Sequence, residues 1–173
     1  MEHFVVCMVG LDRPGVLAAV TAALESRGCN VVGASGAVPS SRFSITFFVD
    51  VEATEEQLRA DLRRELAGLA LDLLEVKAVD GDMHLGKRMR HVPQHTLQGR
   101  VVDGPGVLAS VAKVLADEDV SVKLLHAALE SSTTPTFRTT MIVTIEIGRE
   151  ERIEGRLEEL RSKMGFLELE LRS

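Results

Sequence analysis

Residues 12–17, Asp-Arg-Pro-Gly-Val-Leu, are repeated almost unchanged at residues 103–108 as Asp-Gly-Pro-Gly-Val-Leu, an offset of 91 residues (103 − 12). Each copy follows a short apolar run and precedes a stretch with apolar residues at helical spacing. The same offset pairs Leu24 with Leu115, and the register persists for about twenty residues. A repeat of this length indicates that the chain contains one domain twice.

Both halves show the same order of predicted strands and helices. The first half predicts strands at 3–9, 31–36, 43–51 and 71–79, with helices at about 14–27 and 54–69. The second predicts strands at 95–102, 120–128, 136–147 and 167–171, with helices beginning near 107 and 153. The order β-α-β-β-α-β is that of a ferredoxin-like sandwich. We therefore predict the α+β class, with two tandem ferredoxin-like domains and antiparallel sheets.

The longest polar stretch of the chain lies between these two sets of elements. It predicts a first domain at residues 1–80, a linker at 81–94 and a second domain at 95–173. Domains this small bury only about two thirds of their unfolded surface, so pairing between modules and a homodimer are expected.

Local signals define the helix ends. Asp12 is expected to cap the first helix, with Pro14 at an early helical position and Gly28 as a left-handed stop. Thr54 and Gln57 have the spacing of a capping box. Charged residues of the same helix, including Arg59, are expected on its solvent side.

Composition excludes several classes of function. The formal net charge of −6 argues against a direct nucleic-acid partner, because binding phosphates requires a basic face. The chain has no Trp or Tyr for base stacking. No apolar run reaches the length of a membrane span, and the N-terminus lacks the pattern of a signal peptide, so a cytoplasmic protein is expected.

The repeated loop has the chemistry of a receptor for a zwitterion. A helix N-terminus presents unpaired N–H groups that suit a carboxylate, and Gly15 and Gly106 would allow close approach to the backbone. Asp12 and Asp103 could accept hydrogen bonds from an ammonium group. A free amino acid combines both groups. The alternative is that the motif is only a helix cap and a turn.

Asp-x-Pro-Gly-Val-Leu between a strand and a helix, inside β-α-β-β-α-β, resembles the ACT domain. The two-copy layout is similar to the glycine cleavage system transcriptional repressor family. The resemblance implies a non-enzymatic regulator without a cofactor that senses a small amino acid, such as glycine or serine, and acts on a protein partner. That partner is a transcription regulator of amino-acid (glycine cleavage) metabolism or a metabolic enzyme. The implied amino-acid-binding residues are Asp12, Arg13, Pro14, Gly15, Val16, Leu17, Asn30, Asp103, Gly104, Pro105, Gly106, Val107 and Leu108.

Two other functions stay open: a regulatory subunit of an amino-acid biosynthetic enzyme, as in acetolactate synthase small subunits, and an interaction scaffold without a ligand. The change of Arg13 to Gly104 predicts two unequal sites.

Other reactive residues predict no further site. The spacing of His84, His91 and His95 matches no compact metal-ligand motif, so no metal is expected. His126 is expected in the core or at an interface. Cys7 and Cys29 are expected as reduced, largely buried thiols. No activated nucleophile or acid/base pair is recognisable, and no catalytic residue is expected.

Overall fold

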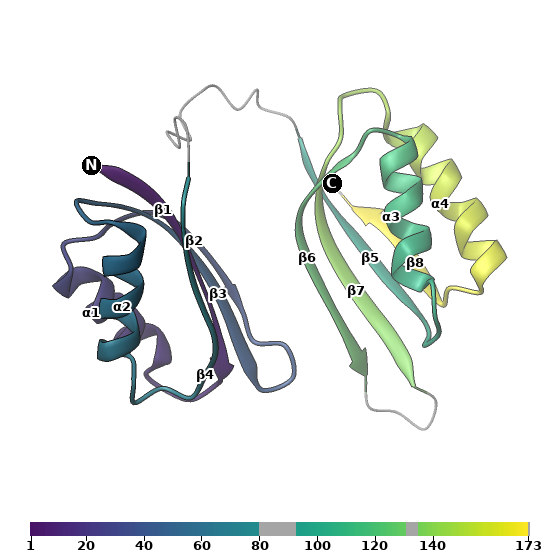
Figure 1. Ribbon diagram of the computed structural model, residues 1–173. Helices are drawn as coiled ribbons and strands as arrows, with labels where there is room; N and C mark the ends of the chain where they lie inside the picture. Colours follow the sequence, from purple (N-terminus) through teal and green to yellow (C-terminus); the bar gives the residue numbers. More distant parts are fainter. Residues whose placement is uncertain (80–92, 131–134, 173) are drawn as a thin grey trace. The chain divides into compact units, whose positions relative to one another are not determined.

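A computed structural model describes residues 1–79, 93–130 and 135–172 (Figure 1). The chain divides into two compact units, Met1–Lys87 and Arg88–Ser173, which we call the first and second modules. The predicted linker, residues 81–94, lies outside the described residues except for Pro93 and Gln94.

The first module is the predicted β-α-β-β-α-β unit. Its strands form one antiparallel sheet in the order β2-β3-β1-β4, and both helices cover the same face of that sheet (Figure 1). The elements are β1 (Glu2–Leu11), α1 (Val16–Ser26), β2 (Asn30–Ala37), β3 (Arg42–Val51), α2 (Glu55–Glu65) and β4 (Leu71–Ala78).

The second module repeats this topology, with an antiparallel sheet in the order β6-β7-β5-β8. Its elements are β5 (Gln94–Val102), α3 (Val107–Asp117), β6 (Ser121–Glu130), β7 (Thr136–Thr144), α4 (Glu150–Met164) and β8 (Glu168–Arg172). The predicted fold class, two tandem ferredoxin-like domains with antiparallel sheets, is therefore confirmed.

Two predicted strand ends are wrong. Alternating apolar residues predicted that this strand extends to Ile147. Instead, β7 ends at Thr144, and Ile147 is 82% exposed. A turn follows there, in which the Arg149 N–H donates to the Glu146 carbonyl. The last strand was predicted to begin with a buried Leu167. Instead, β8 begins at Glu168, Leu167 is exposed, and the preceding Phe166 is buried.

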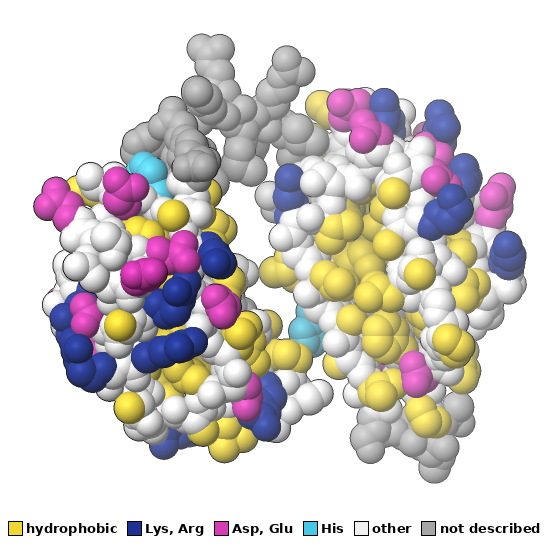
Figure 2. Space-filling model, in the orientation of Figure 1, with side chains coloured by type: hydrophobic (Ala, Val, Ile, Leu, Met, Phe, Trp, Pro, Cys, Tyr) yellow, Lys and Arg dark blue, Asp and Glu magenta, His cyan; other side chains and the backbone are white. Residues whose placement is uncertain are grey.

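Each core forms between the helices and one face of its sheet. In the first module, alternate residues of β1, such as Phe4, Val6 and Met8, are buried with Val20 and Leu24 of α1. Burying one such side chain stabilises the fold by about 1.5–3 kcal/mol, so this two-layer packing is the main source of stability. Charged side chains gather on the outer surface of the first module's helices (Figure 2).

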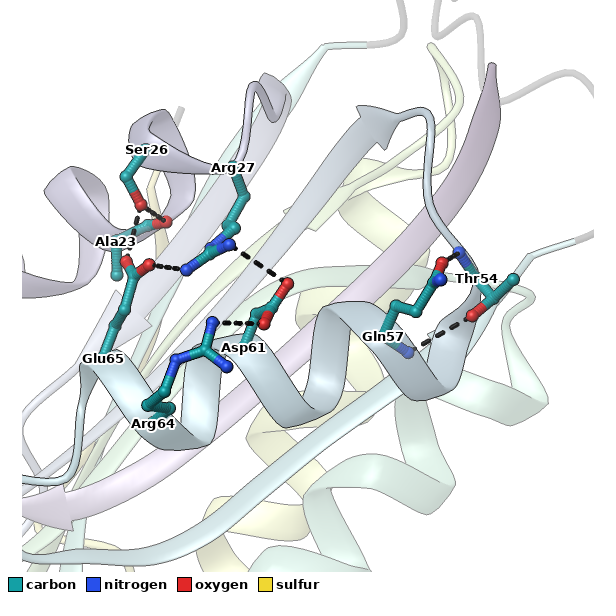
Figure 3. Close-up of polar contacts among 8 residues, drawn as sticks. All are labelled: Ala23, Ser26, Arg27, Thr54, Gln57, Asp61, Arg64 and Glu65. Carbon is teal, nitrogen blue, oxygen red and sulfur yellow. Dashed lines mark hydrogen bonds and ion pairs between the residues drawn. The ribbon is translucent and has the colours of Figure 1, made fainter.

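The predicted helix signals of the first module are confirmed at two ends. At the start of α2, the Gln57 N–H donates to Thr54 Oγ1 (3.2 Å) and the Thr54 N–H donates to Gln57 Oε1 (3.0 Å), which completes the capping box (Figure 3). After α1, Gly28 has a φ of 68°, and the Cys29 N–H donates to the Leu24 carbonyl. This is the left-handed helix stop that glycine favours.

Arg59 corrects the expectation for the charged face of α2. Its half-buried guanidinium donates to the Val76 carbonyl (2.7 Å) and pairs with Glu55. The Ala78 N–H in turn donates to Glu55 (3.0 Å), so this pair joins α2 to β4 instead of lying free in solvent.

No helix among the residues described is long and apolar enough to cross a membrane.

Candidate functional site

The repeated Pro-Gly forms a tight turn before each helix. The Val16 N–H donates to the Arg13 carbonyl (3.3 Å), and Gly15 has φ 90° and ψ −6°. These are the angles of the third residue of a type II turn, which requires positive φ there and favours Pro just before it. Gly106 repeats them, with φ 86° and ψ −4°. The turn explains why both copies keep Pro-Gly.

This turn makes the prediction of an aspartate cap wrong. The N-cap residue of α1 is Gly15, Pro14 lies in the turn before the helix, and no side chain of the described residues caps α1. The Asp12 N–H instead donates to the Ser41 carbonyl (2.9 Å), across the loop that joins β2 to β3. The Asp12 side chain is exposed and has no hydrogen-bond or ion-pair partner within residues 1–79, 93–130 and 135–172. Its carboxylate is therefore available to a ligand.

The first turn of α1 offers donors beside that carboxylate. Within the described parts of the chain, no backbone or side-chain acceptor pairs with the amides of Leu17 and Ala18. Such amides at a helix N-terminus, together with the positive end of the helix dipole, favour a bound anion. The Arg13 guanidinium is directed elsewhere, because it donates to the Gly68 carbonyl (2.7 Å) after α2.

A cavity of about 440 Å³ lies between this turn and β2. Of the predicted first-loop residues, all but Pro14 line it, whereas the predicted Asn30 lies at the other end of β2, opposite Asp50. The lining residues are Asp12, Arg13, Gly15, Val16, Leu17, Ala34, Ser35, Gly36, Ala37, Val38, Phe43, Ile45 and Phe47.

Small residues on β2 leave the space open. Ala34 lies opposite Phe47 and Gly36 opposite Ile45, so short side chains of β2 face large ones of β3. A Cβ at Gly36 would come within 3.0 Å of Ile45 Cγ1, which leaves little space for a larger residue. The run Gly33-Ala34-Ser35-Gly36-Ala37 carries this signal in the sequence, but its pairing with β3 does not follow from local pattern.

Sequence comparison places the first module in a known family. The ACT domain profile matches residues 3–67, which include the Pro-Gly turn and the cavity. A UPF0237 protein of Pyrobaculum aerophilum is 35% identical over 66 residues, which cover 38% of this chain and 72% of that protein. The chain belongs to the ACT-domain family.

Solved structures extend the ACT fold to both modules. An unknown protein from Galdieria sulphuraria matches with a TM-score of 0.74 at 18% identity, over 99% of this chain and 97% of its own. A candidate glycine cleavage system transcriptional repressor matches with a TM-score of 0.70 at 16% identity, over 99% and 98%. Both likenesses concern the fold. The chain therefore contains the ACT fold in tandem.

The second ACT module has the same turn before its helix, but it has larger residues at positions equivalent to those that line the first module's cavity. Asp103 again donates its N–H across a loop, to the Pro135 carbonyl (3.0 Å), and Gly104, which replaces Arg13, has no side chain. Val107 is buried and Leu108 packs against the core. The residues that correspond to Ala34 and Val38 are leucines, Leu125 and Leu129.

These two leucines are 48% and 61% exposed. Figure 2 shows apolar side chains gathered on one face of the second module. The two loops thus have the same backbone conformation at the turn, but the residues of β2 and β6 that lie beside them differ.

The remaining candidates lie apart from this cavity. His84 and His91 lie outside the described residues, and His95 is buried at the start of β5 with its Nε2 4.0 Å from Glu150 Oε1. His126 is exposed on the edge strand β6, so of its two predicted places, the core and an interface, the core is wrong and the interface stays a prediction. Cys7 and Cys29 are free thiols, and burial raises the pKa of Cys29. Where residues are described, no three His, Cys, Asp or Glu side chains gather into a metal-binding group.

Proposed function

We propose that the chain is a non-enzymatic regulator that binds a free amino acid in the cavity of the first ACT module and thereby alters its affinity for a protein partner. One observation carries this proposal. The unpaired Asp12 carboxylate lies at a cavity whose rim also includes the first turn of α1, with its unpaired amides.

The two polar groups suit the two ends of an α-amino acid. Asp12 accepts hydrogen bonds from the ligand's ammonium group, and such charge-assisted bonds are about twice as strong as neutral ones. The amides of Leu17 and Ala18 donate to the ligand's carboxylate, aided by the positive end of the α1 dipole. A ligand with only one of these charges would leave part of the site unpaired.

The cavity supports binding and not catalysis. Its ionisable side chains are Asp12 and Arg13, and Arg13 is occupied by the Gly68 carbonyl. Acid/base catalysis would need a second ionisable group beside Asp12 directed at the ligand, and among the described lining residues none is available for this role.

Ligand binding can reach a partner through the loop between β2 and β3. The Asp12 N–H is bonded to Ser41 in that loop, where both Ser40 (φ 50°) and Ser41 (φ 64°) have positive φ. Positive φ is unfavourable for serine, so the loop is held in a strained conformation. A ligand that joins α1 to β2 favours one arrangement of this loop, and a partner that recognises it binds with changed affinity.

We propose a protein partner of one of two kinds, a transcription regulator or an enzyme of amino-acid metabolism. The net charge of −6 favours a protein over DNA. The edge strands β2 and β6 each have one unpaired side within their own sheet, which supports a homodimer. Light scattering with and without ligand tests the oligomeric state.

Calorimetry on the full chain with each of the twenty amino acids tests the binding site. Asp12→Asn keeps the shape of the side chain and removes its charge, so it should weaken the affinity for the bound amino acid by about tenfold or more. The matched control is Asp103→Asn, which should leave affinity within about twofold, because the second module has larger wall residues. Equal affinity of Asp12→Asn and the unmodified chain would refute the role of Asp12.

A further inference from the structure

We infer that the amino acid bound by the first ACT module has a large apolar side chain, such as that of leucine or phenylalanine, and that glycine and serine bind weakly. This inference rests on the proposed function and specifies its ligand. It departs from the small amino acid that the resemblance to the glycine cleavage repressor family implies.

The size of the cavity is the first reason. Its volume of about 440 Å³ lies within the usual range of ligand sites. Each water molecule occupies about 30 Å³ in the liquid, so glycine would leave most of this space to water. A large side chain displaces that water from apolar walls, and this displacement favours binding.

The chemistry of the walls is the second reason. The inner wall comes from Phe43, Ile45 and Phe47 of β3, and Phe43 and Phe47 are buried in the core. Leu17 and Val38 also line the cavity, yet they are 58% and 51% exposed. An apolar ligand side chain would cover both of these exposed residues, which a polar one would not favour.

The lack of polar partners for a ligand side chain is the third reason. Three lining residues have polar side chains, and Asp12 and Arg13 have the roles described above. The third, Ser35, alternates with Ala34 and Gly36 along β2, so its hydroxyl points to the opposite face of the sheet. A serine or aspartate side chain would therefore find few side-chain hydrogen-bond partners among the described lining residues, which disfavours its transfer from water.

The second module supplies a test that preserves the fold. Leu125 of β6 lies opposite Met141 of β7, just as Ala34 of β2 lies opposite Phe47 of β3. Both β2 and β6 have a bulge at the equivalent position. This backbone therefore accepts leucine at that position. Ala34→Leu should fill the cavity of the first module and leave the sheet intact.

The experiment measures the affinity of the full chain for glycine, serine, leucine and phenylalanine by calorimetry. We expect leucine or phenylalanine to bind at least tenfold more tightly than glycine and serine. We expect Ala34→Leu to lose at least tenfold of that affinity, and the matched control Leu125→Ala to retain it. Circular dichroism checks the fold of both variants.

The outcomes separate the two proposals. Glycine or serine binding as tightly as leucine and phenylalanine would overturn this inference and leave the proposed function standing. Unchanged leucine affinity in a folded Ala34→Leu would also overturn it, because the side chain then binds elsewhere. Binding of none of the twenty amino acids would overturn the proposed function, and this inference with it.

Discussion

Arg27 at the end of α1 and Glu118 at the end of α3 are equivalent residues, 91 positions apart, with opposite charges. Arg27 pairs with Asp61 (3.2 Å) and Glu65 of α2 (Figure 3). Glu118 pairs with Arg152 (2.8 Å) and Arg156 (3.4 Å) of α4. These partners are themselves 91 residues apart, so the whole triad is reversed in charge between the modules.

The reversal favours the correct pairing of helices in a duplicated chain. If α1 packed against α4, Arg27 would face Arg152 and Arg156, and like charges at contact distance are unfavourable. The Glu118 side chain is only 3% exposed, so it depends strongly on its two arginines. We predict that Glu118→Arg lowers the free energy of unfolding by about 3 kcal/mol or more.

Urea unfolding of three variants tests the triad. The triple variant Glu118→Arg, Arg152→Asp and Arg156→Glu reproduces the charges of the first module and should recover most of the lost stability. Arg27→Glu should cost only about 1 kcal/mol, because that side chain is 29% exposed and its ion pairs are partly screened by solvent. Failure of the triple variant to improve on Glu118→Arg would contradict this account.

Asp119 occupies the position at which the first module has Gly28. Its φ is 56°, and the Val120 N–H donates to the Leu115 carbonyl (2.8 Å), so the left-handed helix stop is kept without glycine. We predict that Asp119→Gly stabilises the protein by about 0.5–1 kcal/mol. Chemical denaturation measures the gain. Asp119→Asn, which removes only the charge, should change stability by less, and a larger gain from it would assign the effect to charge.

Glu55 makes the stability of the first module depend on pH. The backbone N–H of Ala78, followed by the Arg59 guanidinium, lowers the pKa of Glu55 below its ordinary value of 4.5. A carboxyl group with a lowered folded-state pKa stabilises the fold above its unfolded pKa and loses this effect as the pH falls through the lower value. We therefore predict that thermal stability decreases below about pH 4.5. Melting curves should show a smaller acid-side decrease for Glu55→Gln, and an unchanged decrease would exclude Glu55 as a contributor.

The capping box of α2 predicts that loss of the Thr54 hydroxyl lowers the stability of the first module. Thr54→Ala removes the acceptor for the Gln57 N–H and should destabilise the first module by about 1 kcal/mol. Thr21→Ala is the matched control, because among the described residues the exposed Thr21 hydroxyl donates only to carbonyls of its own helix, Leu17 and Ala18. The control should change stability by less than about 0.5 kcal/mol in the same denaturation assay. Equal effects would mean that the cap is not the cause.

Local pattern predicted the fold, because strand alternation and helical spacing are properties of neighbouring residues. The repeat around Asp12 and Asp103 then showed that the β-α-β-β-α-β order occurs twice. The helix cap at Asp12 was predicted wrongly because the same residues, Asp-x-Pro-Gly, also fit a type II turn before a glycine N-cap.

The cavity depends on relations that neighbouring residues do not determine. Its volume arises because Ala34 of β2 lies opposite Phe47 of β3, a pairing set by the register of the sheet. The residues of the loop before α1 could be predicted from sequence. The residues of β2 and β3 that line the cavity could be identified only from the tertiary structure. The reversed triad of Arg27 and Glu118 is likewise a contact between helices far apart in sequence.

On the proposed function, the contrast between Ala34 and Leu125 has a consequence for the number of ligands bound by each chain. If only the first module accepts a ligand, one chain binds one amino acid and its saturation curve is hyperbolic. A steep, sigmoidal response then requires association between chains, because cooperativity needs at least two coupled sites. The Hill coefficient would become a function of protein concentration, so dilution would convert a switch into a graded sensor.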